Sequence, residues 1–157
     1  HRQGRGAEAE STWSAMAEQA SDPEVFSDIV LGCAAVQAAC VKVLARAGQM
    51  VEAGDGRRFR RLNFALGSYY LRNKDSVRAI AYMEAGRDKS NKNKIEANDP
   101  EMLAGLAEAY FRAKKFSESL EIFFEMSSEF PVVRQIQDAM QGVYSMEQRS
   151  AGDVKIF

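Results

Sequence analysis

Apolar residues along most of the chain recur at intervals of three and four positions, and no stretch of useful length alternates between apolar and polar residues. This period is typical of amphipathic α-helices. The pattern predicts seven helices, near residues 8–20, 23–47, 57–73, 76–87, 100–113, 117–129 and 132–147. Most connections have two to four residues, so we expect successive helices to run antiparallel.

All three prolines lie where a helix is predicted to begin, at Pro23, Pro100 and Pro131. In the segments 22–24 and 99–101, an Asp precedes the Pro and a Glu follows it. An Asp side chain caps the first free N–H groups, Pro tolerates the first helical position, and Glu favours the positive end of the helix. These two segments therefore predict helix starts.

An internal repeat becomes visible when the chain is compared with itself at an offset of forty residues. Large apolar residues match large ones, and small residues match small ones, in the pairs Leu66 and Leu106, Gly67 and Ala107, Tyr70 and Tyr110, Ala79 and Ser119, Ile80 and Leu120, and Met83 and Phe123. Small residues suit positions where two helices cross closely. The repeat predicts stacked helical hairpins that bury their apolar faces against one another.

The second copy of the repeat resembles the pentatricopeptide repeat at Tyr110, Ala113, Phe116, Glu118, Leu120, Phe123 and Met126. It also resembles the tetratricopeptide repeat at Leu106, Tyr110, Phe116, Leu120, Phe123 and Pro131. The resemblance implies an all-α, short right-handed solenoid of about seven antiparallel helices. We expect one helical-repeat domain over 1–157, with its best repeats at 60–87 and 100–131 and flexible or docking tails at 1–7 and 149–157.

Composition limits the chemistry that the chain offers. Its 157 residues are 46% hydrophobic and 27% charged, which is enough to build a core. The one histidine is His1, so no internal imidazole is available for catalysis or for zinc. No apolar run approaches the roughly 20 residues that span a bilayer. With no nucleotide-binding or hydrolase motif, we predict no catalytic residue, metal, cofactor or small-molecule substrate.

Cys33 and Cys40 lie seven residues apart within the predicted helix 23–47. On one helix they would share a face but lie about 10 Å apart, too far for a disulfide. Their neighbours are small or apolar. We therefore expect two buried free thiols in a reducing compartment, with a redox or metal-binding role as the alternative.

An arginine cluster, Arg57, Arg58, Arg60 and Arg61, follows a Gly-Asp-Gly turn. Residues 57–94 contain eleven Lys/Arg and three Asp/Glu, a net charge of +8, whereas the rest of the chain has ten and nineteen, a net charge of −9. Four cations in the first helical turn oppose the helix dipole, so acidic groups should compensate them. These groups belong either to this chain or to a partner that binds the cluster.

Phe124 is the second candidate for a partner contact. It lies next to Phe123, and neighbouring residues on a helix point about 100° apart, so the two rings face different ways. Phe123 belongs to the apolar line of the helix and Phe124 to its polar line. Phe124 either contacts a partner or packs against the next helix, and Tyr69 beside Tyr70 presents the same alternatives.

Three functions are compatible with this sequence. The first is a non-catalytic protein-binding subunit of a larger assembly. The second is RNA binding, as in pentatricopeptide proteins, although the base-reading positions near 63–65 and 103–105 lack polar groups other than Asn63. The third is capture of an acidic peptide, as in tetratricopeptide adaptors. We favour the first and regard nucleic acid as the less suitable partner.

The size, the helix pattern and the degenerate repeats also resemble the small accessory subunits on the catalytic head of mitochondrial ATP synthase in trypanosomes and other euglenozoans. The resemblance implies attachment to the α subunits of that head and a location in the mitochondrial matrix, peripheral to the inner membrane. It also implies no part in nucleotide chemistry and no RNA binding. The first residue is not Met, so we expect a trimmed or processed chain, with removal of a presequence as one of the alternatives.

Overall fold

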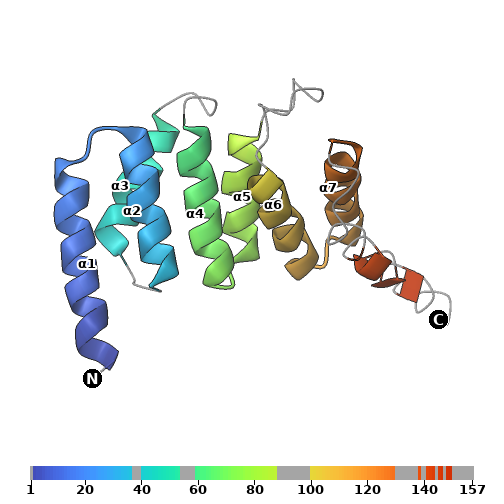
Figure 1. Cartoon of the computed structure of the whole chain (residues 1–157), viewed down its shortest axis with the longest axis horizontal. Helices are drawn as coiled ribbons and strands as arrows, with labels where there is room; N and C mark the ends of the chain where they lie inside the picture. Colours follow the sequence, from blue (N-terminus) through green and yellow to red (C-terminus); the bar gives the residue numbers. More distant parts are fainter. Residues whose placement is uncertain are drawn as a thin grey trace. The chain divides into compact units, whose positions relative to one another are not determined.

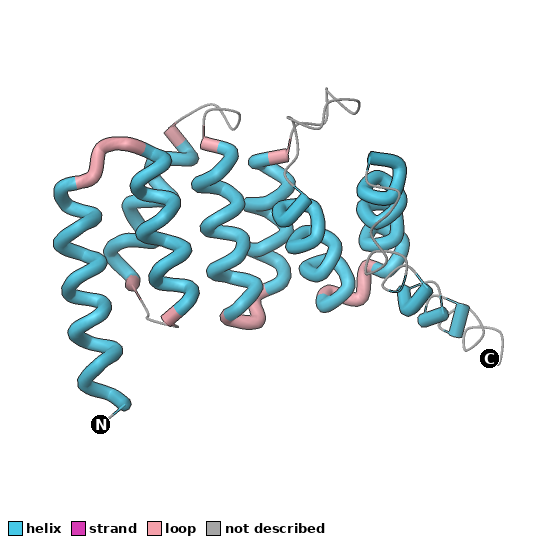
Figure 2. The backbone as a smooth tube through the Cα atoms, viewed as in Figure 1, coloured by secondary structure: helices cyan, strands magenta, loops and turns pink. Residues whose placement is uncertain are grey.

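The computed structural model describes residues 2–36, 40–53, 59–87 and 100–129, together with residues 138, 141–143, 145–146 and 148–149. Within these residues every regular element is an α-helix and no strand occurs, as Figure 2 shows. The all-α prediction is confirmed. The chain forms two compact units, His1–Ser90 and Asn91–Phe157, which are described one at a time.

The first unit contains α1 (Arg2–Gln19), α2 (Pro23–Ala35), α3 (Val41–Glu52), α4 (Arg60–Arg72) and α5 (Ser76–Gly86). Helix α2 packs against α1, α3 and α4, and α4 forms a close pair with α5 (Figure 1). The second unit contains α6 (Pro100–Arg112), which pairs with α7 (Phe116–Glu129).

The starts of two helices follow from local side-chain chemistry. The Asp22 carboxylate accepts a hydrogen bond from the N–H of Glu24 at 2.9 Å, and Pro23 occupies the first position of α2. The carboxylate of Asp75 accepts from the N–H of Arg78 at 3.0 Å and caps α5. Both contacts satisfy N–H groups that have no partner within the helix. The predicted start at Pro100 is likewise confirmed.

The core of the first unit is formed by apolar residues from α2, α3 and α4. Its largest fully buried side chains include Phe26, Ile29, Leu62 and Leu66. The guanidinium of Arg46 on α3 lies over the Phe26 ring and donates hydrogen bonds to the carbonyl oxygens of Ala17 and Ala20 at the end of α1. These bonds satisfy carbonyl groups that the helix end leaves free, and they fix α3 against α1.

The two hairpin turns repeat each other forty residues apart. Lys74 and Lys114 both adopt left-handed backbone conformations, with φ of 63° and 59°. In the first turn the N–H of residue 75 donates to the carbonyl of Tyr70, and in the second the N–H of residue 115 donates to that of Tyr110, at 2.9 Å in both. The helices before the turns also begin and end forty residues apart. The internal repeat therefore has a structural counterpart in α4–α5 and α6–α7.

Two of the predicted helix boundaries are wrong. The single helix predicted over 23–47 is instead the two helices α2 and α3, and α3 continues to Glu52, five residues past the predicted end. Folding back lets Phe26 and Ile29 of α2 and Val43 of α3 enter one core. Tertiary burial here overrides local helix propensity. The tail predicted over 1–7 is helical from Arg2, since extending an existing helix adds a backbone hydrogen bond for each residue fixed.

The prediction of free thiols is also wrong, because Cys33 and Cys40 form a disulfide with their Cα atoms 6.2 Å apart. The expected separation assumed one continuous helix. Because the chain reverses between α2 and α3, the two cysteines come within bonding distance. Burial of both side chains, the other part of that prediction, is confirmed.

The remaining boundaries agree closely with the predicted ones. Helices α5, α6 and α7 differ from the predicted ranges by one residue at an end. Most of the helix predicted over 132–147 lies outside the described residues, and those described within it are helical, as are 148–149 at the edge of the predicted tail. Residues 150–157 of that tail also lie outside the described residues.

Candidate interaction surface

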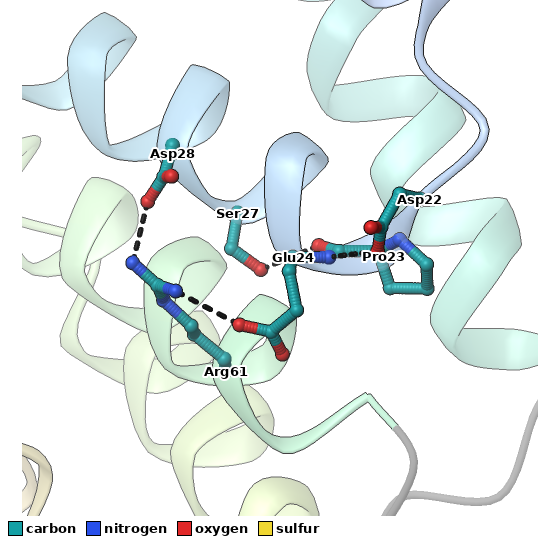
Figure 3. A network of polar contacts seen from close by, with 6 residues as sticks. All are labelled: Asp22, Pro23, Glu24, Ser27, Asp28 and Arg61. Carbon is teal, nitrogen blue, oxygen red and sulfur yellow. Dashed lines mark hydrogen bonds and ion pairs between the residues drawn. The ribbon is translucent and has the colours of Figure 1, made fainter.

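Arg61 of the arginine cluster forms ion pairs with two carboxylates of the same chain. Its guanidinium donates to Glu24 at 2.8 Å and to Asp28 at 2.6 Å, both on the first turns of α2 (Figure 3). The hydrogen bond to Glu24 is the main cause of a raised pKa for Arg61, and the charge of Asp28 adds to it. All three side chains are about half exposed, so we expect at most ~1 kcal/mol from the pairs.

Of the other three arginines in the cluster, the structure describes only Arg60. Arg60 is half-buried at the start of α4, next to Arg61. Its carbonyl oxygen would lie 3.1 Å from a Cβ atom added to Gly86, so α4 and α5 approach closely here. Arg57 and Arg58 lie outside the described residues. For Arg61, the compensating acidic groups belong to this chain.

Phe124 lies on α7 with 56% of its surface exposed. Its neighbours on the same helix, Ile122 and Met126, are buried, as the helical period requires. Phe124 belongs to the second unit and the arginine cluster to the first. The two predicted contacts are therefore separate candidates.

A groove in the first unit, which we call the tyrosine groove, was missed by the sequence reasoning. It has a volume of about 570 Å³ and lies between α3 and α5 over part of α4. Helix α3 supplies six of its ten lining residues. They are Val41, Leu44, Ala45, Gly48, Gln49 and Glu52 from α3, Tyr69 and Tyr70 from α4, and Arg78 and Tyr82 from α5.

An aromatic stack connects α4 and α5 in the tyrosine groove. The rings of Tyr70 and Tyr82 are parallel, with their centroids 5.6 Å apart, and Tyr69 meets Tyr70 edge-on. The guanidinium of Arg78 lies 5.2 Å from the centre of the Tyr70 ring and also pairs with Asp75 at 3.3 Å. These contacts hold the rings in fixed positions, so the groove offers preformed aromatic surface to a ligand.

Burial raises the pKa of both Tyr69 and Tyr82, and the neighbouring Tyr70 adds to the rise. For Tyr82, the charge of Glu52 also raises the pKa, whereas that of Arg78 lowers it. Both phenols therefore stay protonated at neutral pH and are able to donate a hydrogen bond. The adjacent residues Tyr69 and Tyr70 marked this region as a candidate contact in the sequence. The sequence did not predict the groove, because only tertiary packing brings Tyr82 and the small residues of α3 next to these two tyrosines.

A smaller groove lies in the second unit. It has a volume of about 300 Å³, and its lining is almost wholly apolar, from Phe111 on α6, Phe123 on α7, and Val143 and Met146. Glu108 stands at its edge and pairs with Arg112 one turn away. Phe123 is half-buried and lines this groove, whereas the buried apolar residues among the described side chains of α7 are Ile122 and Met126, so the predicted seam position of Phe123 is only partly met.

Among the described residues, no cluster of three or more His, Cys, Asp or Glu side chains is placed to hold a metal ion. None of the described helices is both long and apolar enough to cross a membrane. Comparison of the chain with protein-family models, with curated proteins and with solved structures finds no match.

Proposed function

We propose that this protein is a non-catalytic binding subunit, a short helical-repeat solenoid that holds another protein in a larger assembly. The observation that carries the proposal is the tyrosine groove, where fixed aromatic rings line an open channel between two helices. Tyrosine and arginine are, with tryptophan, enriched among the residues that dominate protein–protein binding energy. Both are present here, with Ala45 and Gly48 leaving room on the opposite wall.

The solenoid that we propose is right-handed, as the resemblance of the sequence to tetratricopeptide and pentatricopeptide repeats implies. Its support is the repetition of helix boundaries and turn geometry at an interval of forty residues. Stacked hairpins bury their apolar faces against neighbours and leave extended surfaces for partners.

The partner that we propose is the α subunit of the ATP synthase catalytic head, in the mitochondrial matrix. This part of the proposal rests on the resemblance in size, helix pattern and repeats. RNA binding is less well supported, because Arg61 already pairs with two carboxylates of the chain, which reduces the positive charge that it offers to phosphate.

Binding to purified catalytic head or isolated α subunit, measured by calorimetry, tests the proposal. Ala45→Arg places a long side chain in the tyrosine groove from an exposed position of α3 and should weaken binding at least about tenfold. Ala81→Arg adds the same side chain at an exposed position of α5 that does not line the groove, and it should bind like the wild type.

Two outcomes would contradict the proposal. One is equal loss of affinity in the two variants, which would place the contact outside the tyrosine groove. The other is no binding to the head, together with binding of single-stranded RNA that weakens steeply with salt. Phe124→Ser, measured in the same assay, separately tests the candidate contact on α7.

A further inference from the structure

The local sequence does not predict the reversal between α2 and α3. Residues 33–47 contain neither Gly nor Pro and are rich in alanine, so their local preference is for continuous helix. Cys40, the cap residue of α3, makes no side-chain capping hydrogen bond. Something other than local sequence must therefore hold this reversal.

The disulfide adds a covalent constraint to the tertiary burial that produces the reversal. It joins Cys33, in the last turn of α2, to Cys40, immediately before α3, and both side chains are fully buried. Cys40 has φ of 43°, a left-handed conformation that is costly for a residue with a Cβ atom. The bond thus accompanies a backbone conformation that the local sequence disfavours.

The first turn of α3 is the part of the tyrosine groove nearest to the disulfide. The N–H of Leu44 donates to the carbonyl of Cys40 at 3.0 Å, the first hydrogen bond of the helix, and Val41 and Leu44 line the groove. Beyond this turn, Arg46 ties α3 to the end of α1. Loss of the disulfide should therefore loosen the first turn and leave the rest of α3 in place.

We propose that the Cys33–Cys40 disulfide is a reversible redox clip that fixes the first turn of α3 and, with it, one wall of the tyrosine groove. Local opening of the first turn of α3 exposes the buried sulfurs, and a dithiol reductant, either a small molecule or a thioredoxin-type protein, then opens the clip. Its thiolate attacks one sulfur to form a mixed disulfide, which its second thiol resolves. The reductant leaves as a disulfide, and two electrons and two protons reach Cys33 and Cys40 as two thiols.

Hydrogen exchange of single amides tests the clip in the whole chain without any partner. Dithiothreitol should accelerate exchange of the Leu44 amide at least about tenfold through local opening. The first helical hydrogen bonds of α5 and α7 are matched controls, Ala79 N–H to Asp75 at 3.1 Å and Ser119 N–H to Lys115 at 3.1 Å. These amides should change by less than about twofold, because neither adjoins the disulfide.

Two further readouts show whether the clip is reversible. Alkylation followed by intact mass should find two new thiols after reduction and none after glutathione disulfide is added. Trp13, the one tryptophan, packs against Gly32 beside Cys33, so its fluorescence should change on reduction and return on reoxidation. In the variant C33A/C40A, Leu44 should exchange rapidly with or without the reductant.

Equal exchange of Leu44 in both redox states would overturn the proposal. So would a simultaneous acceleration of Leu44 and Ala79, because the bond would then simply support the whole unit. The effect on partner binding rests on the proposed function, whereas the exchange test does not. If reduction accelerates exchange of the Leu44 amide but leaves affinity for the catalytic head unchanged, the redox clip is supported and its proposed effect on binding at the tyrosine groove is contradicted.

Discussion

Ser119 Oγ donates a hydrogen bond to the carbonyl oxygen of Ala107 across 2.8 Å and joins α7 to α6 within a buried seam. Forty residues earlier, Ala79 and Gly67 occupy the same positions in α5 and α4. There the carbonyl oxygen of Ala79 would lie 3.2 Å from a Cβ atom added to Gly67. In each hairpin, the two helices thus cross closely at the position where both copies of the repeat have small residues.

Two substitutions of Ser119 distinguish the contribution of its hydrogen bond to stability from the contribution of its side-chain volume. Ser119→Ala should lower the free energy of unfolding by about 1 kcal/mol, because a buried hydrogen bond is lost without a change of shape. Ser119→Val should cost more, about 1–3 kcal/mol, because extra carbon atoms crowd the crossing. Urea unfolding measures both changes. Equal stability of the two variants would show that the crossing is not tightly packed.

Gly67→Ala should destabilise the first hairpin. The added Cβ atom would clash with Cγ of Met83, which is fully buried and has little room to move. We expect a net loss of about 1–2 kcal/mol, since overpacking exceeds the gain in helix propensity. Gly48→Ala is the matched control, because its Cβ atom would meet only the Tyr82 hydroxyl at 3.6 Å. That variant should be as stable as the wild type or up to about 1 kcal/mol more stable.

Arg61→Gln should cost less than about 1 kcal/mol, because its ion pairs with Glu24 and Asp28 are about half exposed. Arg61→Glu should cost more, since it places a third carboxylate beside the other two. The difference between these variants should shrink in 0.5 M salt, where the charges are screened. Thermal unfolding at low and high salt measures it, and a difference that salt does not change would point to packing.

Stability should fall as pH rises above about 10, the ordinary pKa of tyrosine. The pKa of Tyr82 is raised in the folded chain, so above its ordinary pKa the unfolded chain loses this proton first. Its contribution is therefore complete below that pH and disappears as pH rises through the folded value. Tyr82→Phe should make the alkaline loss of stability smaller, as measured by urea unfolding between pH 8 and 11. An identical pH dependence in both proteins would contradict this assignment.

Much of the fold follows from the sequence. The helical period, the Asp-Pro-Glu start of α2 and the forty-residue repeat are local signals, and local signals determine local structure. For Tyr69 and Tyr70, the sequence left open whether the rings pack within the chain or contact a partner, and the burial of Tyr69 and partial burial of Tyr70 in the structure correspond to the first alternative. For Arg61, the sequence showed that acidic groups were needed but not which ones, because Glu24 and Asp28 lie more than thirty residues away.

Tertiary structure alone decided that α2 ends at Ala35 and α3 begins at Val41, and it alone decided the disulfide and the tyrosine groove. Continuous helix satisfies the local preferences of residues 23–47, but it does not bring Phe26 and Val43 into one core. Burying both sets of apolar residues offsets the cost of the reversal, and the reversal brings Cys33 to Cys40. The same packing places α3 opposite α5. A sequence pattern records which face of a helix is apolar, whereas only the packed chain decides which faces meet.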